Sequence, residues 1–507
     1  MKRYLSLLLC LLLCLSLCAC RQEDSTDGSD ESGDSGSQNE NLRLGAFVLP
    51  YFQDQSLDPY TCPDGVQQDL CALLYEGLFV LDENITPQNQ LCLRYSCDED
   101  YLRYNFILRP DILFSDGSRV ENTDVVASLE RARSSQRYGE RLKLLRSVKA
   151  EEDGSITVTL SSPHGNLTAL LDVPITKADG SLLGTGPYQL ISDGKNAQLQ
   201  ANPYWRNGTP ALESIPLLGL KTSDSVAHPL SSHEIQALTV DLIGSEELTY
   251  SGSFSSAEVD TSNFCYLGFN TQGIFADANL RCVIAQGIDR EKLVTAFLSG
   301  HARASQFAIS PVSPLYPSYL EEAYSLYDYQ QALAALGFTQ GKTQRVTLLV
   351  NEENPFRLSA ANYISQALTY GDLVVTVKAL PWDEYVSALN SGRFDLYFAE
   401  TRLTADWDPS ALVCAGGSLN FGGYENSTLE SILKVYASTP PAELGTSINA
   451  LCSYLQQEMP IVPLCFKTRT ILLQQNVAEG ISSTINAPYS QLYCWIFHTE
   501  EETEAGQ

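Results

Sequence analysis

The side chains that most often do chemistry are present in this sequence, but their spacing forms no catalytic or metal-binding motif. With 61 Asp and Glu residues, neighbouring carboxylates arise by chance, so a pair carries no information about glycoside hydrolysis. No Gly-x-Ser-x-Gly string is present to hold a serine nucleophile. The five histidines form no helical metal-binding pair; they are His164, His228, His233, His301 and His498. We predict no catalytic residue, no metal ligand and no cofactor, and a secreted surface hydrolase stays open as the alternative from another class.

One thiol, Cys20, stands where an apolar segment changes abruptly into a polar one. A basic start precedes a Leu- and Cys-rich run over 4–20. A bilayer-spanning helix needs about 20 apolar residues, so this shorter run predicts a secretory signal peptide over 1–19. The order Leu-Cys-Ala-Cys at 17–20 resembles the bacterial lipobox, in which the last Cys carries the lipid. We expect Cys20 to be lipidated; an ordinary signal cleaved nearby, with a spare thiol at Cys20, is the alternative.

The segment after Cys20 has the composition of a tether. Residues 21–41 hold seven carboxylates and one Arg among many Ser, Gly and Asn, with no aliphatic side chain to bury. Such a chain cannot repay the entropy cost of folding, and as a flexible coil it would span about 25 Å. We expect 20–41 to be a lipidated Cys followed by a disordered acidic tether, and 500–507 to be an acidic tail.

Charge and hydropathy limit the partners of the remaining chain. The net charge of −29 argues against nucleic acid and against adhesion to anionic headgroups. No later segment approaches 18 uninterrupted apolar residues, so we expect no further membrane span. With 44% hydrophobic residues, the chain can bury a large core and should form two or three lobes.

Ten of the 14 cysteines lie beyond the signal region. In an oxidising compartment, Cys62 with Cys71 and Cys92 with Cys97 are candidate short-range disulfides. Most of the ten sit among apolar neighbours, so burial as small hydrophobic thiols is equally consistent with the sequence.

The elements that position these residues alternate between strands and helices. Short β-branched and aromatic runs predict strands at 42–50, 104–109, 156–162, 265–271, 345–351, 373–380 and 394–400. Helical periodicity predicts helices at 122–135, 276–289, 327–338, 359–368, 382–392 and 445–458. Asn122 and Thr123 are the expected caps of the first helix. The alternation predicts an α/β chain with mostly parallel sheets and helices on their faces.

Several stretches, in order, resemble the family 5 extracellular solute-binding proteins of ABC importers. They are "LLYEGLFVLDENITP" (73–87), "YNFILRPDILFSDGSRVENTDVVASLERAR" (104–133), "GTGPYQL" (184–190), "NPYWRNGTPALESI" (202–215), and "YLGFNT" to "GIDREKL" (266–293). Later stretches continue in the same order, among them "ADWDPSAL", "NFGGYENSTLESIL" and "EMPIVPLCF". The resemblance covers residues 42–499 and implies a receptor for peptides, or in some members nickel or other small solutes.

The resemblance also implies an architecture, a periplasmic-binding-protein-like, three-lobed clamshell of type II with a hinge between lobes. Its first lobe would combine 42–58, 177–270 and 472–499. Residues 59–176 would form the second lobe and 271–471 the third. Ligand would lie between the first and third lobes, and closure would desolvate it.

The resemblance points to Asp406 as the acceptor of a peptide's α-ammonium, since it forms an Ala-Asp step before Asp408-Pro409. Capping of the helix that starts near Pro409 is the alternative role. Arg402 and Leu403 stand where many members have a Trp, which places a cation near the cleft. Trp407 and Trp382 are candidate aromatic walls, or core residues.

Two further ligand contacts are expected in "SLNFGGYEN" (418–426), namely Asn420 and Tyr424, although both are also common turn residues. We therefore expect a monomeric, lipid-anchored receptor on the outer face of a Gram-positive-type cell membrane. It would bind a peptide-like solute and pass it to ABC permease subunits. A receptor for nickel or a metallophore is the alternative within the family.

Overall fold

The computed structural model describes residues 47–498 except 64 and 246–247, all of them within the compact unit Gly45–Gln507. The predicted signal peptide, Cys20, the predicted tether and the predicted acidic tail fall outside the described residues. None of the helices between residues 47 and 498 has both the length and the apolar character needed to span a bilayer.

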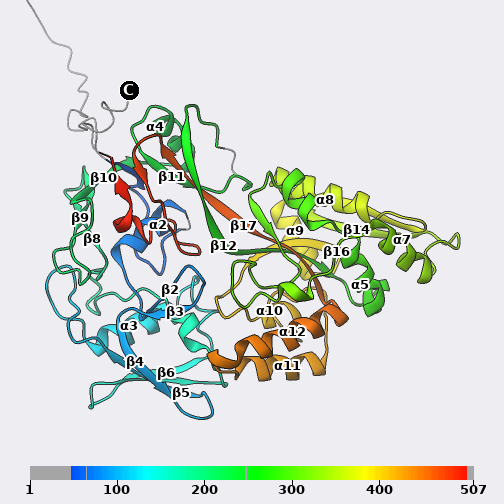
Figure 1. Cartoon of the computed structure of the whole chain (residues 1–507), viewed down its shortest axis with the longest axis horizontal. Coiled ribbons are helices and arrows are strands. Elements are labelled where there is room, and N and C mark those ends of the chain that lie inside the picture. The colour runs from blue at the N-terminus through cyan, green and yellow to red at the C-terminus, as the bar shows by residue number, and fades with distance from the viewer. Residues whose placement is uncertain (1–46, 64, 246–247, 499–507) are drawn as a thin grey trace, which may run out of the picture. The chain divides into compact units, whose positions relative to one another are not determined.

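The first sheet combines the start of the described chain with its middle (Figure 1). In spatial order, its strands are β1 (Leu49–Phe52), β10 (Ser214–Leu220), β9 (Ala197–Ala201) and β8 (Tyr188–Ser192). Only the β1–β10 pair is parallel. Helix α2 (Val66–Leu74) contacts β1 and β8, and α4 (Ala227–Ser231) follows β10 after the 3-10 turn η2 (Ser223–Val226).

The C-terminal segment shares the core of this first sheet. Phe47 lies edge-on to Trp495, and both pack with Leu49, Tyr188 and Ile215. The segment comprises a two-residue pair, β18 (Ala478–Glu479) with β19 (Ile496–Phe497), and the 3-10 turn η7 (Leu492–Cys494). The two ends of the described chain are therefore held together by one apolar cluster.

A second, wholly antiparallel sheet lies within residues 92–160. Its order is β4 (Cys92–Cys97), β5 (Arg103–Leu108), β7 (Ile156–Leu160) and β6 (Leu145–Ala150). Alternate residues of β7 are buried, as a half-buried strand requires. Helix α3 (Asn122–Arg133) contacts β6, while β2 (Phe79–Leu81), β3 (Pro87–Asn89) and η1 (Leu167–Leu170) complete this region.

The start of α3 differs from its prediction. Glu121 is the N-cap, in a capping box with Asp124, and Asn122 is the first helical residue. The Asn122 amide instead donates to the backbone oxygens of Gly154 and Ser155, at 2.9 and 3.4 Å. The Asn122 side chain, which local preference predicts as a helix cap, therefore makes a tertiary hydrogen bond instead.

The third sheet is the largest, with spatial order β11-β17-β12-β16-β14-β15 and β13 on β17. Its strands are β11 (Ala237–Val240), β12 (Phe254–Phe269), β13 (Ala302–Ala304), β14 (Gln344–Asn351), β15 (Leu373–Leu380), β16 (Leu396–Arg402) and β17 (Ile461–Gln474). Only β14–β15 and β14–β16 are parallel. The prediction of mostly parallel sheets is wrong, because β12 and β17 come from distant parts of the chain and pair antiparallel.

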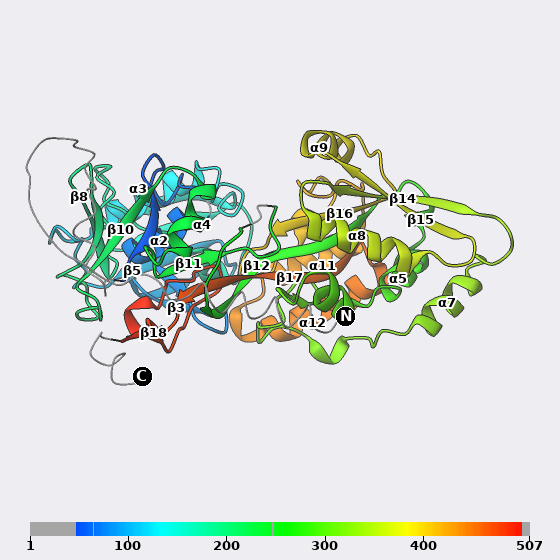
Figure 2. The ribbon, with the colours of Figure 1, turned by 90° about the horizontal axis from the view of Figure 1, so that it is seen from above.

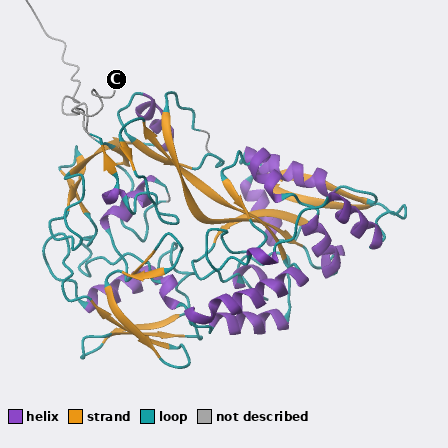
Figure 3. Cartoon of the chain, viewed as in Figure 1, coloured by secondary structure: helices purple, strands orange, loops and turns teal. Residues whose placement is uncertain are grey.

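Helices cover both faces of the third sheet, as Figures 2 and 3 show. One face packs α5 (Ala278–Gln286), α7 (Leu326–Ala335), α8 (Pro355–Leu368) and the π-helical turn η4 (Leu293–Phe297) after α6 (Arg290–Lys292). The other packs α9 (Trp382–Asn390), α10 (Ser410–Val413), α11 (Ser427–Ala437) and α12 (Leu444–Glu458). Short 3-10 turns are η3 (Ile274–Ala276), η5 (Ser318–Leu320) and η6 (Pro441–Glu443).

Strands β12 and β17 link the first core to the third. Val259 and Ile471 pack in the cluster of the first sheet, whereas Leu267 and Val462 pack in a cluster of the third. These two paired strands are continuous between both clusters (Figure 1).

Of the two cysteine pairs proposed from spacing, the structure brings one together. The Sγ atoms of Cys62 and Cys71 lie 3.8 Å apart in a buried position. Cys92 and Cys97 mark opposite ends of β4, about 17 Å apart at the rise of a strand, beyond the reach of a disulfide. All ten cysteines between 47 and 498 are thiols in this structure.

We expect Cys62 and Cys71 to form a disulfide when the protein is treated with oxidised glutathione, because their sulfur atoms need only a small approach. Peptide mapping after alkylation of the unfolded chain measures this. Cys92 and Cys97 serve as the internal control and should both be alkylated. Alkylation of Cys62 and Cys71 to the same extent as that control would contradict the prediction.

Candidate functional site

A cavity of about 670 Å³ is lined by several chain segments that are far apart in the sequence. One wall comes from α2 and its C-cap and includes Cys71 and Tyr75. A second comes from 137–144 and 162–174, which flank strands of the second sheet. The third comes from residues 401–412, which include the end of β16, the turn after it and the start of α10, with additional residues at 484–490. A volume of this size accommodates a small-molecule or short-peptide ligand.

The end of β16 and the turn after it carry three of the residues singled out from the sequence, Arg402, Asp406 and Trp407, and all three line the cavity. Trp407 adopts φ 54°, in the left-handed region, and its ring packs edge-on to Phe466 at 5.7 Å. The indole is therefore mostly a core group. The N-cap of α10 is Pro409, which has no side-chain cap hydrogen bond, and Asp408, rather than Asp406, accepts from the backbone N–H of Ser410 at 2.9 Å.

The carboxylate of Asp406 is 6% exposed and fully engaged. Its Oδ2 lies 3.0 Å from Nε2 of His164, a buried residue from the loop after β7. Its Oδ1 accepts from the Thr404 hydroxyl and, at 3.5 Å, from the backbone N–H of Asp408. Burial raises the pKa of Asp406, but the hydrogen bond and charge of His164 outweigh burial and lower it overall. The acid is therefore held ionised in the cavity wall.

Three guanidinium groups gather around Tyr138 in the same cavity. Burial raises the pKa of the Tyr138 hydroxyl, and the charges of Arg141, Arg137 and Arg402 oppose that rise. Arg141 pairs with Asp172, donates from Nε to the Leu170 oxygen at 3.0 Å, and has its pKa lowered to about 10 by burial. The cavity thus presents both a carboxylate and a group of cations.

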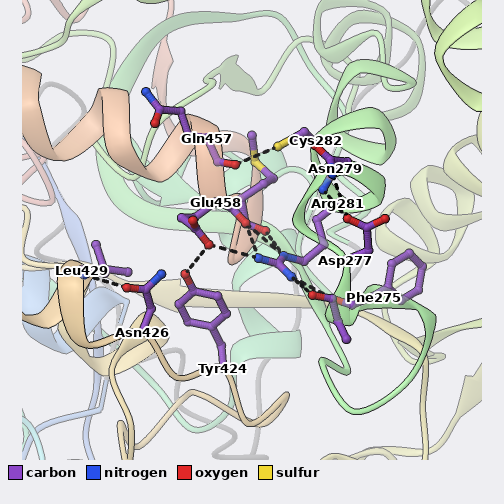
Figure 4. Close-up of polar contacts among 12 residues, drawn as sticks. Phe275, Asp277, Asn279, Arg281, Cys282, Tyr424, Asn426, Leu429, Gln457 and Glu458 are labelled. Carbon is purple, nitrogen blue, oxygen red and sulfur yellow. Dashed lines mark hydrogen bonds and ion pairs between the residues drawn. The ribbon is translucent and has the colours of Figure 1, made fainter. Parts of the chain in front are cut away.

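The other three predicted contacts do not line the cavity. Trp382 begins α9, is 55% exposed and stacks on Tyr385. The Asn420 amide donates to the backbone oxygens of Cys414 and Tyr424, at 2.8 and 2.7 Å, and so closes a turn. Tyr424 points away into a polar cluster with Glu458 and Arg281 (Figure 4), where its hydroxyl donates to Glu458 at 3.2 Å.

Local sequence pattern gave no indication that His164, Arg137, Tyr138 and Arg141 would line the cavity. They belong to connecting segments of the second sheet, and 242 positions separate His164 from Asp406. Histidine was considered only as a metal ligand in local pairs. Among the described residues, no group of three or more His, Cys, Asp or Glu side chains is arranged to hold a metal ion. Only the tertiary contact identifies His164, since nothing in its local spacing does.

Comparison with known proteins gives one consistent result. Residues 86–421 match the family model described as bacterial extracellular solute-binding proteins, family 5 middle. The glutathione-binding protein GsiB of Escherichia coli (strain K12) is 24% identical over 445 residues, covering 81% of this chain and 86% of GsiB.

Solved structures show the same fold. The oligopeptide-binding protein AppA from Bacillus subtilis, in complex with a nonapeptide, has a TM-score of 0.62 at 20% identity, covering 90% of this chain and 98% of AppA. NikZ from Campylobacter jejuni, in complex with Ni(L-His), has a TM-score of 0.66 at 17% identity, covering 90% of this chain and 100% of NikZ. These similarities confirm the predicted mixed α/β fold of the type II periplasmic-binding-protein class.

Proposed function

Because this chain belongs to the family 5 bacterial extracellular solute-binding proteins, which are receptors of ABC importers and not enzymes, we propose a specific ligand and setting for it. The protein binds a peptide-like solute carrying both an ammonium and a carboxylate in the cavity around Asp406. It then delivers that solute to the membrane permease.

The observation that carries this proposal is the mixed charge of the cavity. Asp406 is a buried, ionised carboxylate, which suits an ammonium group. Arg137 and Arg402 line the same space and suit a carboxylate, which guanidinium groups bind through paired hydrogen bonds, whereas Arg141 is already paired with Asp172. Peptides carry both groups, and a nonapeptide occupies AppA.

We further propose the three-lobed organisation, with 42–58, 177–270 and 472–499 as the first lobe, 59–176 as the second and 271–471 as the third. The separate second sheet and the distinct clusters of the first and third sheets support this division. Strands β12 and β17 would then be the hinge connection, since they run between those clusters.

The proposed setting is the outer face of a Gram-positive-type cell membrane, with a monomeric receptor attached through lipid on Cys20. Its support is the lipobox-like order at 17–20 and the acidic, Ser- and Gly-rich composition of 21–41. The tether would let the receptor reach both the solute and the permease.

Native mass spectrometry of residues 42–507, purified without ligand removal and then denatured, tests the ligand. Release of short peptides would support the proposal and report the preferred length. Release of a metal chelate would favour the nickel alternative, for which NikZ with Ni(L-His) is a structural precedent. Release of a solute without an amino group would contradict the role of Asp406.

A further inference from the structure

His164 occupies the position at which a ligand ammonium would contact Asp406. The Asp406 carboxylate offers two oxygens, and Oδ1 already accepts from Thr404 and Asp408. The remaining oxygen, Oδ2, faces Nε2 of His164 at 3.0 Å. Oδ2 has a second lone pair, but it is buried and already in contact with this imidazole, so a ligand ammonium that reaches it competes with His164.

The backbone on either side of His164 is held in place. The Tyr104 hydroxyl donates to the His164 oxygen at 2.6 Å, and the His164 N–H donates to the Tyr101 oxygen at 3.1 Å. The next residue, Gly165, donates to the Ala437 oxygen at 2.7 Å. A methyl group at Gly165 would collide with the backbone oxygen of Thr439, so the loop is in close contact with the segment after α11. The imidazole is therefore presented to Asp406 by a fixed backbone.

We propose that His164 is a specificity-determining residue that selects ligands with a free ammonium group, because such a group replaces the imidazolium on Asp406 and the imidazole releases its proton to solvent. The inference rests on the proposed function of Asp406. Charge is balanced in the exchange: the ligand brings one positive charge into the wall of the cavity, and one proton leaves His164. A neutral ligand group in the same place would leave a buried carboxylate without a counter-charge, which is costly.

The unpaired nitrogen of His164 fits this role. Nδ1 is buried and has no hydrogen-bond partner among the described residues. The imidazolium therefore depends mainly on Asp406, with a smaller contribution from the charge of Asp408. Once an ammonium takes Oδ2, the buried ring is expected to become neutral.

The pH dependence follows from the groups that face this pair. Burial lowers the pKa of His164, but the hydrogen bond and charge of Asp406, with the charge of Asp408, outweigh it and raise the pKa overall. Burial and the charge of Asp406 raise the pKa of Asp408. The other facing groups are Arg141, Tyr104 and Tyr436. In the complex, the ligand cation lowers the pKa of His164 below its value in the ligand-free protein. Between these two pKa values of His164, ammonium binding releases a proton, so the affinity rises with pH by up to about tenfold per pH unit.

The experiment offers the full chain an equimolar synthetic library of di- to pentapeptides together with its N-acetylated copy. Bound peptides are quantified by mass spectrometry from about pH 5 to about pH 7, a range in which histidine changes charge while the peptide α-ammonium, with a pKa of about 8, stays mostly charged. We expect the bound ratio of free-amine to acetylated peptides to rise several-fold across this range. In His164→Gln the ratio should be independent of pH, whereas His228→Gln, at a histidine whose side chain is 85% exposed, should behave as the parent.

The outcomes separate the two proposals. Binding of neither library copy would overturn the proposed function, and with it this inference. Preference for free amines at a ratio that does not change with pH in the parent protein would overturn the role of His164 alone. If the ratio still depends on pH in His164→Gln but not in Asp408→Asn, the proton released on binding comes from Asp408. That result would also overturn the role of His164. The parent measurement stands even if His164→Gln fails to fold.

Discussion

Asp406→Asn is expected to weaken the binding of free-amine peptides by about 2 kcal/mol or more, about 30-fold in Kd. The substitution keeps the size of the side chain and its place beside Thr404 and His164, but removes the negative charge that an ammonium needs. Because the site is buried, water cannot substitute for the lost counter-charge. Titration calorimetry at neutral pH with a peptide recovered from the protein measures the change.

The N-acetylated form of the same peptide is the matched control, since it has no ammonium to lose. Its affinity should change little between the parent and Asp406→Asn. Glu140→Gln is the control at the level of the protein, because Glu140 lines the same cavity but its exposed carboxylate pairs with Lys143. An equal loss for the free and acetylated peptides would show that Asp406 shapes the cavity rather than binds the amine.

Asp69→Asn is expected to lower the free energy of unfolding by about 3 to 5 kcal/mol. The Asp69 carboxylate is 2% exposed and accepts two hydrogen bonds from Arg469, at 2.8 and 2.7 Å. This pair joins α2 to β17 across 400 positions of the chain. Removal of the acid leaves a buried guanidinium without its counter-charge, which accounts for the size of the loss. Urea unfolding followed by circular dichroism measures it.

Glu140→Gln provides the contrast, because Glu140 forms an ion pair of the same chemical type with Lys143 at the surface. Their side chains are 64% and 66% exposed, so water replaces the interaction at little cost. We expect a change below about 1 kcal/mol. If Asp69→Asn lay within the range of this control, the buried pair would contribute no more than a surface pair.

Local sequence pattern was sufficient to predict most of the helices that pack on the third sheet and the parallel strands of that sheet. The periodicity of 359–368 and 382–392 corresponds to α8 and α9, and the apolar runs at 345–351 and 373–380 correspond to β14 and β15. These elements follow one another along the chain and bury one face each, so composition and spacing carry the information.

Strand β17 was not predicted, although it is among the longest strands of the structure. Its sequence contains Pro463, which ordinarily argues against a central strand. In the structure, the register of β17 against β12 shifts between Cys265 and Tyr266, and Tyr266 lies opposite Pro463. The irregularity admits the proline, and only the partner strand, about two hundred positions away, shows this.

The sequence by itself determined the family-like order of motifs, the mixed α/β class and the absence of a recognisable catalytic motif, and it singled out the Ala405-Asp406 step as a candidate. These depend on residue type and short-range spacing. The tertiary structure alone decided the partners of Asp406: His164 on its second oxygen and the arginines that share its cavity. It also moved Asn420 and Tyr424 out of the cavity and into local hydrogen bonds. The physical reason is that a binding cavity is made by segments brought together through the burial of cores that no local pattern encodes.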